Sequence, residues 1–336
     1  MGARETSTSR TCPRPRRRPH RAQGTSTPGT GAETPSSTGD GHITDPPAAE
    51  AEAPSVGITA EIKLSDYALP DVELFTPRRR TFTAPDGTPV EGFVLRDETL
   101  TGAGPLPLDA HGGPHNAWAP VFDGIHLYHQ VLAARGWTVL TVNPRGSDGY
   151  GEAFCKAVLG AWGIADTDDL LSPIDEPVGE GIAMLDRLAV IGYRYGSYVS
   201  YWLPARTDRF KTAISGGCLS GLVSAAGASD EGHFLRTYEC RGDAAAQSPM
   251  THVDRVTTPA LLLHGEGDYL CPVGQAERWF AALRERSVPV RLVRYPDGSH
   301  LFILDGRPYR RVDCNERIVE WLQQWIPVDG GPVSPN

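Results

Sequence analysis

The chain has 336 residues, of which 40% are hydrophobic and 22% charged, the composition of a globular protein. Its formal net charge of −9 at pH 7 argues against a nucleic-acid-binding protein. No apolar run is long enough to span a bilayer, which argues against a membrane protein.

The sequence predicts four segments in chain order. Residues 1–55 are rich in Arg, Ser, Thr and Pro and lack an apolar periodicity that could bury surface. They are therefore predicted to form a disordered tail. Residues 56–100 are predicted to form strands and a hairpin that lead into the main domain. Residues 101–327 are predicted to form one catalytic domain, and residues 328–336 a loose tail. The basic cluster Arg14–Arg18 has no hydrophobic segment after it, which argues against a secretory signal peptide.

The six cysteines are widely scattered, with no CxxC pair and no metal-ligand spacing. They predict reduced thiols in a cytoplasmic protein rather than a disulfide framework. The sequence predicts no cofactor and no metal ion, and it leaves the oligomeric state open.

Strand and helix signals alternate along the chain. Apolar runs and turn residues predict strands at Glu73–Phe75, Arg80–Thr83, Val90–Leu95, Leu106–Ala110, Thr138–Val142, Leu188–Ile191, Phe210–Ser215, Pro259–Gly265 and Val290–Tyr295. Helical spacing predicts helices over Val121–Arg135, Gly151–Gly160, Val273–Arg286 and Val312–Trp325, with short helices between Gly216 and Thr251. The central apolar runs are continuous, which is typical of parallel strands buried on both faces, so an α/β fold is expected.

The stretch Ile191–Ser197 joins a predicted strand to a segment that can start a helix. A strand, a tight turn flanked by Gly192 and Gly196, and a helix make the geometry of a nucleophile elbow, which presents one side chain from a strained turn. That side chain is Arg194. A guanidinium stays protonated and offers no usable lone pair, so Arg194 cannot act as an ordinary nucleophile.

Several spaced motifs make the chain resemble the catalytic domain of the prolyl oligopeptidase family of serine peptidases, nearest to its acylaminoacyl-peptidase branch. The motifs are His111-Gly112-Gly113-Pro114, Asn143–Ser147 with Gly149-Tyr150-Gly151, Trp162-Gly163 with Asp166 and Asp169, the elbow, Thr207–Phe210, Ser248-Pro249, His264–Asp268 with Cys271-Pro272, and Ser299-His300. The resemblance covers roughly residues 81–326. It implies the α/β-hydrolase fold, a mostly parallel sheet with helices on both faces, and the triad order Ser, Asp, His.

The resemblance also implies the residues of an active site. Asp268 matches the family's triad aspartate and His300 its triad histidine. The backbone N–H of Tyr195, just after the nucleophile position, matches one oxyanion-hole donor. The residues expected beside this donor are His111, Gly112 and Gly113.

Three positions depart from the family pattern: Arg194 replaces the serine, Ser197 replaces a glycine, and Pro204 interrupts the helix after the elbow. The chain is therefore predicted to be an impaired or repurposed relative of enzymes that act on peptide or acyl-amino-acid bonds. The main hypothesis is a pseudohydrolase that binds a peptide-like or acyl small-molecule ligand, with Arg194 holding its anionic group. An equal alternative is a dead site that Arg194 occludes by pairing with Asp268.

Two further hypotheses stay open, and with them the question of whether the chain is an enzyme. His300, oriented by Asp268, could transfer protons without a covalent intermediate, as in an epimerase, lyase or cyclase. An active hydrolase could instead use an activated water or a displaced nucleophile. The candidate nucleophiles are Ser197, Ser200, Cys218 and Cys271, although buried inert thiols are the preferred interpretation of the two cysteines.

The remaining polar motif residues are given structural roles. The carboxylates predicted to be solvated helix caps are Asp148, Asp166, Asp168 and Asp169. His111, His115 and His264 are predicted to be loop and supporting residues rather than metal ligands.

Overall fold

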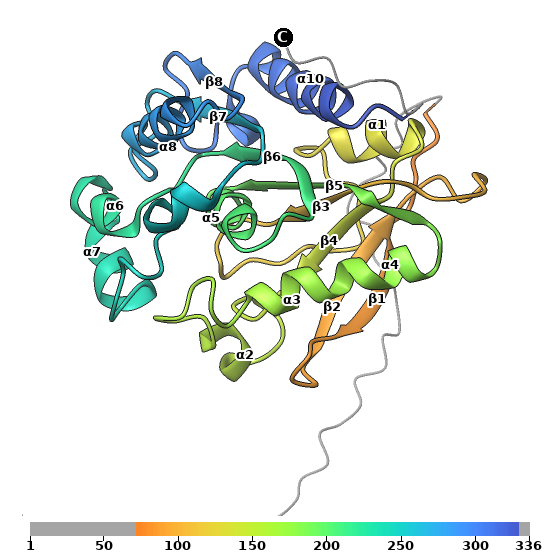
Figure 1. Ribbon diagram of the computed structural model, residues 1–336, viewed down its shortest axis with the longest axis horizontal. Helices are drawn as coiled ribbons and strands as arrows, with labels where there is room; N and C mark the ends of the chain where they lie inside the picture. The colour runs from red at the N-terminus through yellow and green to blue at the C-terminus, as the bar shows by residue number, and fades with distance from the viewer. Residues whose placement is uncertain (1–71, 329–336) are drawn as a thin grey trace, which may run out of the picture. The chain divides into compact units, whose positions relative to one another are not determined.

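The computed structural model describes residues 72–328, which form a sheet with helices on both faces (Figure 1). The predicted tail 1–55, the first part of the lead-in segment and all of the predicted C-terminal tail but residue 328 lie outside the described residues. The strands are β1 (Arg78–Thr83), β2 (Pro89–Leu95), β3 (Gly104–Ala110), β4 (Val139–Asn143), β5 (Ala183–Tyr193), β6 (Phe210–Gly216), β7 (Ala260–Gly265) and β8 (Val290–Tyr295).

The eight strands form one sheet in the order β1-β2-β4-β3-β5-β6-β7-β8. The ladders β1–β2 and β2–β4 are antiparallel. Every ladder from β4 through β3 to β8 is parallel. The prediction of a mostly parallel sheet is confirmed, and the antiparallel edge comes from the predicted hairpin.

The helices are α1 (Tyr128–Ala134), α2 (Glu152–Lys156), α3 (Thr167–Leu171), α4 (Asp175–Gly179), α5 (Tyr195–Trp202), α6 (Leu222–Ala228), α7 (Gly232–Phe234), α8 (Gly274–Glu285), α9 (Phe302–Asp305) and α10 (Pro308–Trp325). Short non-α turns are η1 (Ser172–Ile174), η2 (Leu203–Ala205), η3 (Leu235–Glu239) and η4 (Pro249–Arg255). Figure 1 shows α1 and α10 on one side of the sheet and α3 and α4 on the other. No helix among residues 72–328 is long and apolar enough to cross a membrane.

The core consists of apolar side chains that alternate between the two faces of the central strands. In β5, Val190 packs in the cluster that contains Trp202 of α5, whereas the next residue, Ile191, packs in the cluster that contains Leu322 of α10. Successive strand residues point to opposite faces, so both must be apolar when helices cover both faces. This is why the central strands are continuous apolar runs.

The predicted helix over Val121–Arg135 is wrong in its first half, because α1 begins only at Tyr128. The carboxylate of Asp123 accepts hydrogen bonds from the backbone N–H of Ile125 at 2.7 Å and from the side chain of His126 at 2.7 Å. An aspartate that bonds its own downstream backbone stabilises a turn in place of a helix. The predicted strand Glu73–Phe75 is also wrong, since residues 72–77 carry no regular structure.

Two prolines show how local rules are met in the fold. Pro107 lies inside β3, where the ladder to β4 begins only at Leu108, so its missing N–H removes no bond of that ladder. Pro204 follows the end of α5 at Trp202 and lies in the 3₁₀ turn η2. The predicted interruption of the helix is confirmed.

Candidate functional site

Arg194 occupies the turn between β5 and α5. Its backbone has φ 55° and ψ −111°, which is uncommon for any residue except glycine. A Cβ on Gly192 would lie 2.2 Å from the backbone of Gly196, and a Cβ on Gly196 would lie 1.9 Å from the carbonyl oxygen of Ala110. Both flanking positions therefore require glycine, and the turn has the strand–turn–helix form that the sequence predicted.

The guanidinium of Arg194 pairs with a carboxylate that the sequence did not indicate. Its Nη2 lies 3.3 Å from Oε2 of Glu231, with the side chains 36% and 56% exposed. Within residues 72–328 the structure records no ion pair between Arg194 and Asp268. The expectation that Arg194 pairs with Asp268 is therefore wrong, because Asp268 has partners of its own.

Asp268 and His300 lie side by side after the ends of β7 and β8. Nδ1 of His300 is 2.8 Å from Oδ2 of Asp268, whose side chain is fully buried. The backbone N–H of Cys271 donates to the other oxygen of Asp268 at 2.7 Å. A buried carboxylate held on both sides keeps Nδ1 of His300 protonated and leaves Nε2, which bonds to no described residue, able to accept a proton.

A second buried histidine, His264, lies beside this pair, with its Nε2 3.6 Å from Oδ2 of Asp268. The ring of His264 accepts a hydrogen bond from the backbone N–H of Cys218 at 3.1 Å and donates one to the carbonyl of Cys271 at 2.7 Å. Burial lowers the pKa of His264, so its ring is neutral. His264 thus supports the loop that carries Asp268, in agreement with the supporting role predicted for it.

The loop after β3 lies against the elbow. A Cβ on Gly112 would lie 3.2 Å from the carbonyl oxygen of Tyr193 and 3.5 Å from Cβ of Arg194. His111 is buried, and burial lowers its pKa to about 4, so it is neutral at pH 7. Tyr195 is the first residue of α5, where a backbone N–H has no intrahelical partner. The structure thus brings together the residues proposed for an oxyanion hole.

The alternative nucleophiles are buried and engaged. Oγ of Ser197 donates to the carbonyl of Arg194 at 2.5 Å, and Oγ of Ser200 lies 2.5 Å from Oγ of Ser215. Cys218 and Cys271 are buried free thiols, and burial raises the pKa of Cys218 to about 12 and that of Cys271 well above its usual value. A protonated, enclosed thiol is a poor nucleophile.

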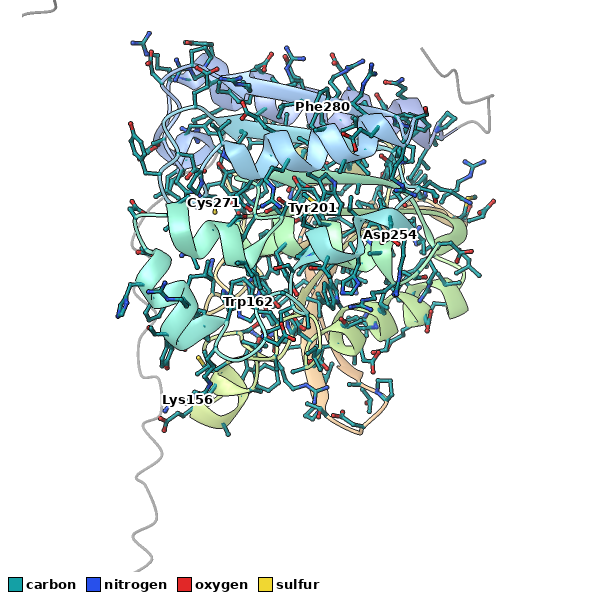
Figure 2. The ribbon with its side chains drawn as sticks, turned by 60° about the vertical axis from the view of Figure 1, so that its left-hand side comes forward. Lys156, Trp162, Tyr201, Asp254, Cys271 and Phe280 are labelled. Atoms are coloured by element: carbon teal, nitrogen blue, oxygen red, sulfur yellow. The ribbon has the colours of Figure 1, made fainter. Side chains whose placement is uncertain are left out.

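A cavity of about 40 Å³ opens beside Arg194. It is lined by Gly113, Trp162, Arg194, Leu219, Ser229, Glu231, Phe234, Leu235, Glu239, Leu270 and Cys271. Trp162 and Cys271, both labelled in Figure 2, lie near the segment that carries α6 and α7. The sequence predicted short helices in this segment but gave no signal for Glu231 or Glu239, whose contacts join residues far apart in the chain.

The four aspartates predicted to be solvated helix caps divide into two pairs. Asp148 and Asp168 are exposed, but Asp166 and Asp169 are buried, so the prediction is wrong for the second pair. Arg145 binds both carboxylate oxygens of Asp169, at 2.7 and 2.9 Å. The hydroxyl of Tyr195 donates to Asp166, and burial raises the pKa of Asp166 to about 7.

Comparison with known proteins places these features in a family. The model of the prolyl oligopeptidase family matches residues 125–328. The uncharacterized peptidase YuxL of Bacillus subtilis is 36% identical over 261 residues, which are 74% of this chain and 39% of YuxL. The Pyrococcus horikoshii acylaminoacyl peptidase has a TM-score of 0.72 at 27% identity, over 76% of this chain and 42% of that structure.

A further solved structure adds a ligand. An acylaminoacyl peptidase in complex with Z-Gly-Gly-Phe-chloromethyl ketone has a TM-score of 0.72 at 27% identity, over 76% of this chain and 42% of that one. The chain therefore spans less than half the length of each of these relatives.

Proposed function

The chain belongs to the prolyl oligopeptidase family and has its α/β-hydrolase fold, and from that premise we propose that it is a pseudohydrolase that binds a peptide-like ligand with an anionic group. The observation that carries the proposal is the guanidinium of Arg194 in the turn where a hydrolase of this fold has its nucleophile. Arginine cannot act as a covalent nucleophile at that position, because its guanidinium stays protonated, but the guanidinium can bind an anion.

The surroundings of Arg194 support an anion site. Its ion pair with Glu231 engages one nitrogen, and among residues 72–328 the other N–H donors of the planar guanidinium have no partner, so they can bind a carboxylate. The N-terminus of α5, which begins at Tyr195, adds backbone donors and a favourable dipole. A peptide-like ligand is supported by the relative that carries Z-Gly-Gly-Phe-chloromethyl ketone.

The test compares glycyl-phenylalanine with glycyl-phenylalaninamide, which differ only in the carboxylate. A charge-assisted hydrogen bond contributes about 1.5–3 kcal/mol, so the wild type should bind the acid at least about tenfold more tightly. Arg194→Ala should remove this preference while the two ligands still compete for one site. Titration calorimetry measures all four affinities, and equal affinities of the wild type for acid and amide would contradict the proposal.

A second candidate function rests on the His300–Asp268 pair. Their 2.8 Å contact and the free Nε2 of His300 favour a non-covalent acid/base enzyme of the epimerase, lyase or cyclase type. Such an enzyme would exchange solvent deuterium into its ligand in a His300-dependent way. A hydrolase with a displaced nucleophile is the weakest candidate, because Ser197, Ser200, Cys218 and Cys271 are buried.

The proposal extends to the location and division of the chain. We propose a cytoplasmic protein, because the five cysteines within residues 72–328 are free thiols, as expected in a reducing compartment. We also propose residues 101–327 as the hydrolase-like domain and residues 56–100 as its lead-in segment.

A further inference from the structure

We propose that the cavity over β2 and β4, which the loop from Ala117 to Ile125 borders, binds a small aromatic molecule that carries a hydroxyl group. No residue lines both this cavity and the one beside Arg194. The inference therefore goes beyond the proposed function and does not depend on it.

The cavity is large enough for such a molecule. Its volume of about 390 Å³ lies in the usual range of small-molecule sites. Its floor is formed by side chains of two neighbouring strands, and the apolar ones are Phe93, Leu95 and Val139. All three are at most 4% exposed, so a ligand here would contact the sheet itself rather than flexible surface side chains.

Trp118 forms a fixed aromatic wall of this cavity. Its backbone N–H donates to Oδ1 of Asn143 at 2.7 Å, and the side-chain amide of Asn143 donates to its carbonyl at 3.0 Å. The indole Nε1 donates to the carbonyl of Asp109 at 3.2 Å. Because the ring is already held, stacking a ligand on it costs little further ordering. With Phe93 and Phe122 also in the lining, the cavity favours an aromatic ring over an aliphatic chain.

Two polar side chains lie close together in this apolar lining. Thr141 of β4 is paired in register with Asp109 of β3, so the two side chains lie next to each other on one face of the sheet. Nε2 of His129, at the start of α1, lies 2.6 Å from Oδ2 of the same Asp109. Thr141 and His129 both line the cavity, whereas Asp109 lies behind them and is buried.

The hydrogen-bonding capacity of these two side chains matches a hydroxyl group. Among residues 72–328, neither Nδ1 of His129 nor Oγ1 of Thr141 has a hydrogen-bond partner, and neither atom is sealed within the protein. Because Nε2 donates to Asp109, Nδ1 of the neutral ring is an acceptor, while the hydroxyl of Thr141 can donate. A phenolic hydroxyl can donate to His129 and accept from Thr141 at once, whereas an aryl ether or ketone can only accept.

The test compares 4-fluorophenol with 4-fluoroanisole, in which a methyl group replaces the hydroxyl hydrogen. Titrations followed by ¹⁹F NMR at pH 7 should show that the wild type binds the phenol at least about fivefold more tightly. Thr141→Val removes the hydroxyl with little change of shape, and His129→Gln keeps a donor to Asp109 but lacks Nδ1. Each should weaken binding of the phenol by about threefold or more and leave that of the ether within about twofold. Thr81→Val, at an exposed position of β1, is the matched control and should change neither affinity.

The outcomes decide the inference independently of the elbow. Equal affinities of the wild type for the two ligands, or no binding of the phenol, would overturn it, as would phenol binding that Thr141→Val and His129→Gln leave unchanged. Arg194→Ala should leave both affinities unchanged, and a loss there would place the phenol at the elbow and also overturn the inference. A negative result with glycyl-phenylalanine concerns only the proposed function. If His129→Gln does not fold, Thr141→Val decides together with Thr141→Ser, which keeps the hydroxyl and should retain the preference for the phenol.

Discussion

Arg194 holds a strained backbone that its own side chain does not explain. A non-glycine residue at such a positive φ costs of order 1–3 kcal/mol. The ion pair with Glu231, at 3.3 Å between partly exposed groups, contributes no more than about 1 kcal/mol. The conformation is therefore imposed by the packing of Gly192 and Gly196 around the turn, and it should persist when the side chain at position 194 is changed.

Arg194→Ser should create a hydrolase from the existing scaffold. The new hydroxyl would stand in the strained turn, with His300 held by Asp268 at 2.8 Å and the N–H of Tyr195 available to an oxyanion. We expect hydrolysis of a p-nitrophenyl ester to rise on the order of 10²-fold over the wild type, because one missing member of such a triad accounts for a large part of the rate.

The control for this experiment is the double variant Arg194→Ser with His300→Ala, which should return to the wild-type rate. If the single variant folds and remains inactive, the geometry around His300 is not competent for catalysis. A gain that survives the loss of His300 would mean that the new hydroxyl acts without that base.

At the scale of single residues, the sequence indicates the functional residues that lie within short motifs. The strand, the two glycines and the helix start of the elbow indicate Arg194, whereas Asp268 and His300 are indicated only by motifs that resemble those of the prolyl oligopeptidase family. Glu239, which lines the cavity beside Arg194, is not indicated, since its contact with His115 joins segments that are distant in sequence. The burial of Asp166 was missed for the same reason, because the hydroxyl that reaches it belongs to Tyr195 of α5.

At the scale of elements, the position of α5 depends on how closely it approaches β3. Gly196 lies in the first turn of α5, and a Cβ there would come within 1.9 Å of the carbonyl oxygen of Ala110. Backbone atoms on both sides leave no flexible side chain that could give way. The register of α5 against the sheet, and with it the direction of the elbow, therefore requires glycine at this position.

Gly196→Ala should destabilise the protein by about 3 kcal/mol or more, because α5 must move away from β3. Gly227→Ala is the matched control: Gly227 lies in α6, where an added Cβ would meet nothing within 4 Å, so alanine should be neutral or stabilise by about 0.5–1 kcal/mol. Urea unfolding monitored by circular dichroism measures both. Similar free energies of unfolding for the two variants would show that the close approach is not rigid.

Element boundaries were predicted well where periodicity alone decides and poorly where a side chain competes with the backbone. The strands β4, β6 and β7 follow the predicted apolar runs closely, because burial on both faces requires apolar residues there, whereas β5 begins at Ala183, five residues before the predicted strand. The start of α1 was missed because Asp123 bonds Ile125 and forms a turn before the apolar stripe can continue as a helix. Periodicity carries no information about such a local hydrogen bond.

At the scale of the whole molecule, two buried groups make the stability of the fold depend on pH in opposite directions. Burial lowers the pKa of His111 to about 4, so on acidification the imidazole is protonated in the unfolded chain before it is protonated in the folded chain. The free energy of unfolding therefore decreases as the pH falls from about 6.5 to 4. The pKa of Asp166 is raised to about 7 by burial, so stability is lost as the pH rises from about 4 to 7. The two effects partly cancel between pH 4 and 6.5.

Asp166→Asn should remove the contribution of Asp166 to the pH dependence and leave that of His111. An asparagine resembles the protonated aspartate, can still accept the hydrogen bond from the hydroxyl of Tyr195, and does not titrate. Because the folded wild type must ionise a buried carboxyl above its raised pKa, the variant should gain about 3 kcal/mol relative to the wild type between pH 5 and pH 8. Asp168→Asn, which removes one exposed negative charge two residues away, controls for the change in net charge. Urea unfolding at the two pH values gives the four differences, and an Asp166→Asn advantage that stays constant or shrinks with rising pH would mean that Asp166 is ionised in the folded protein at pH 5.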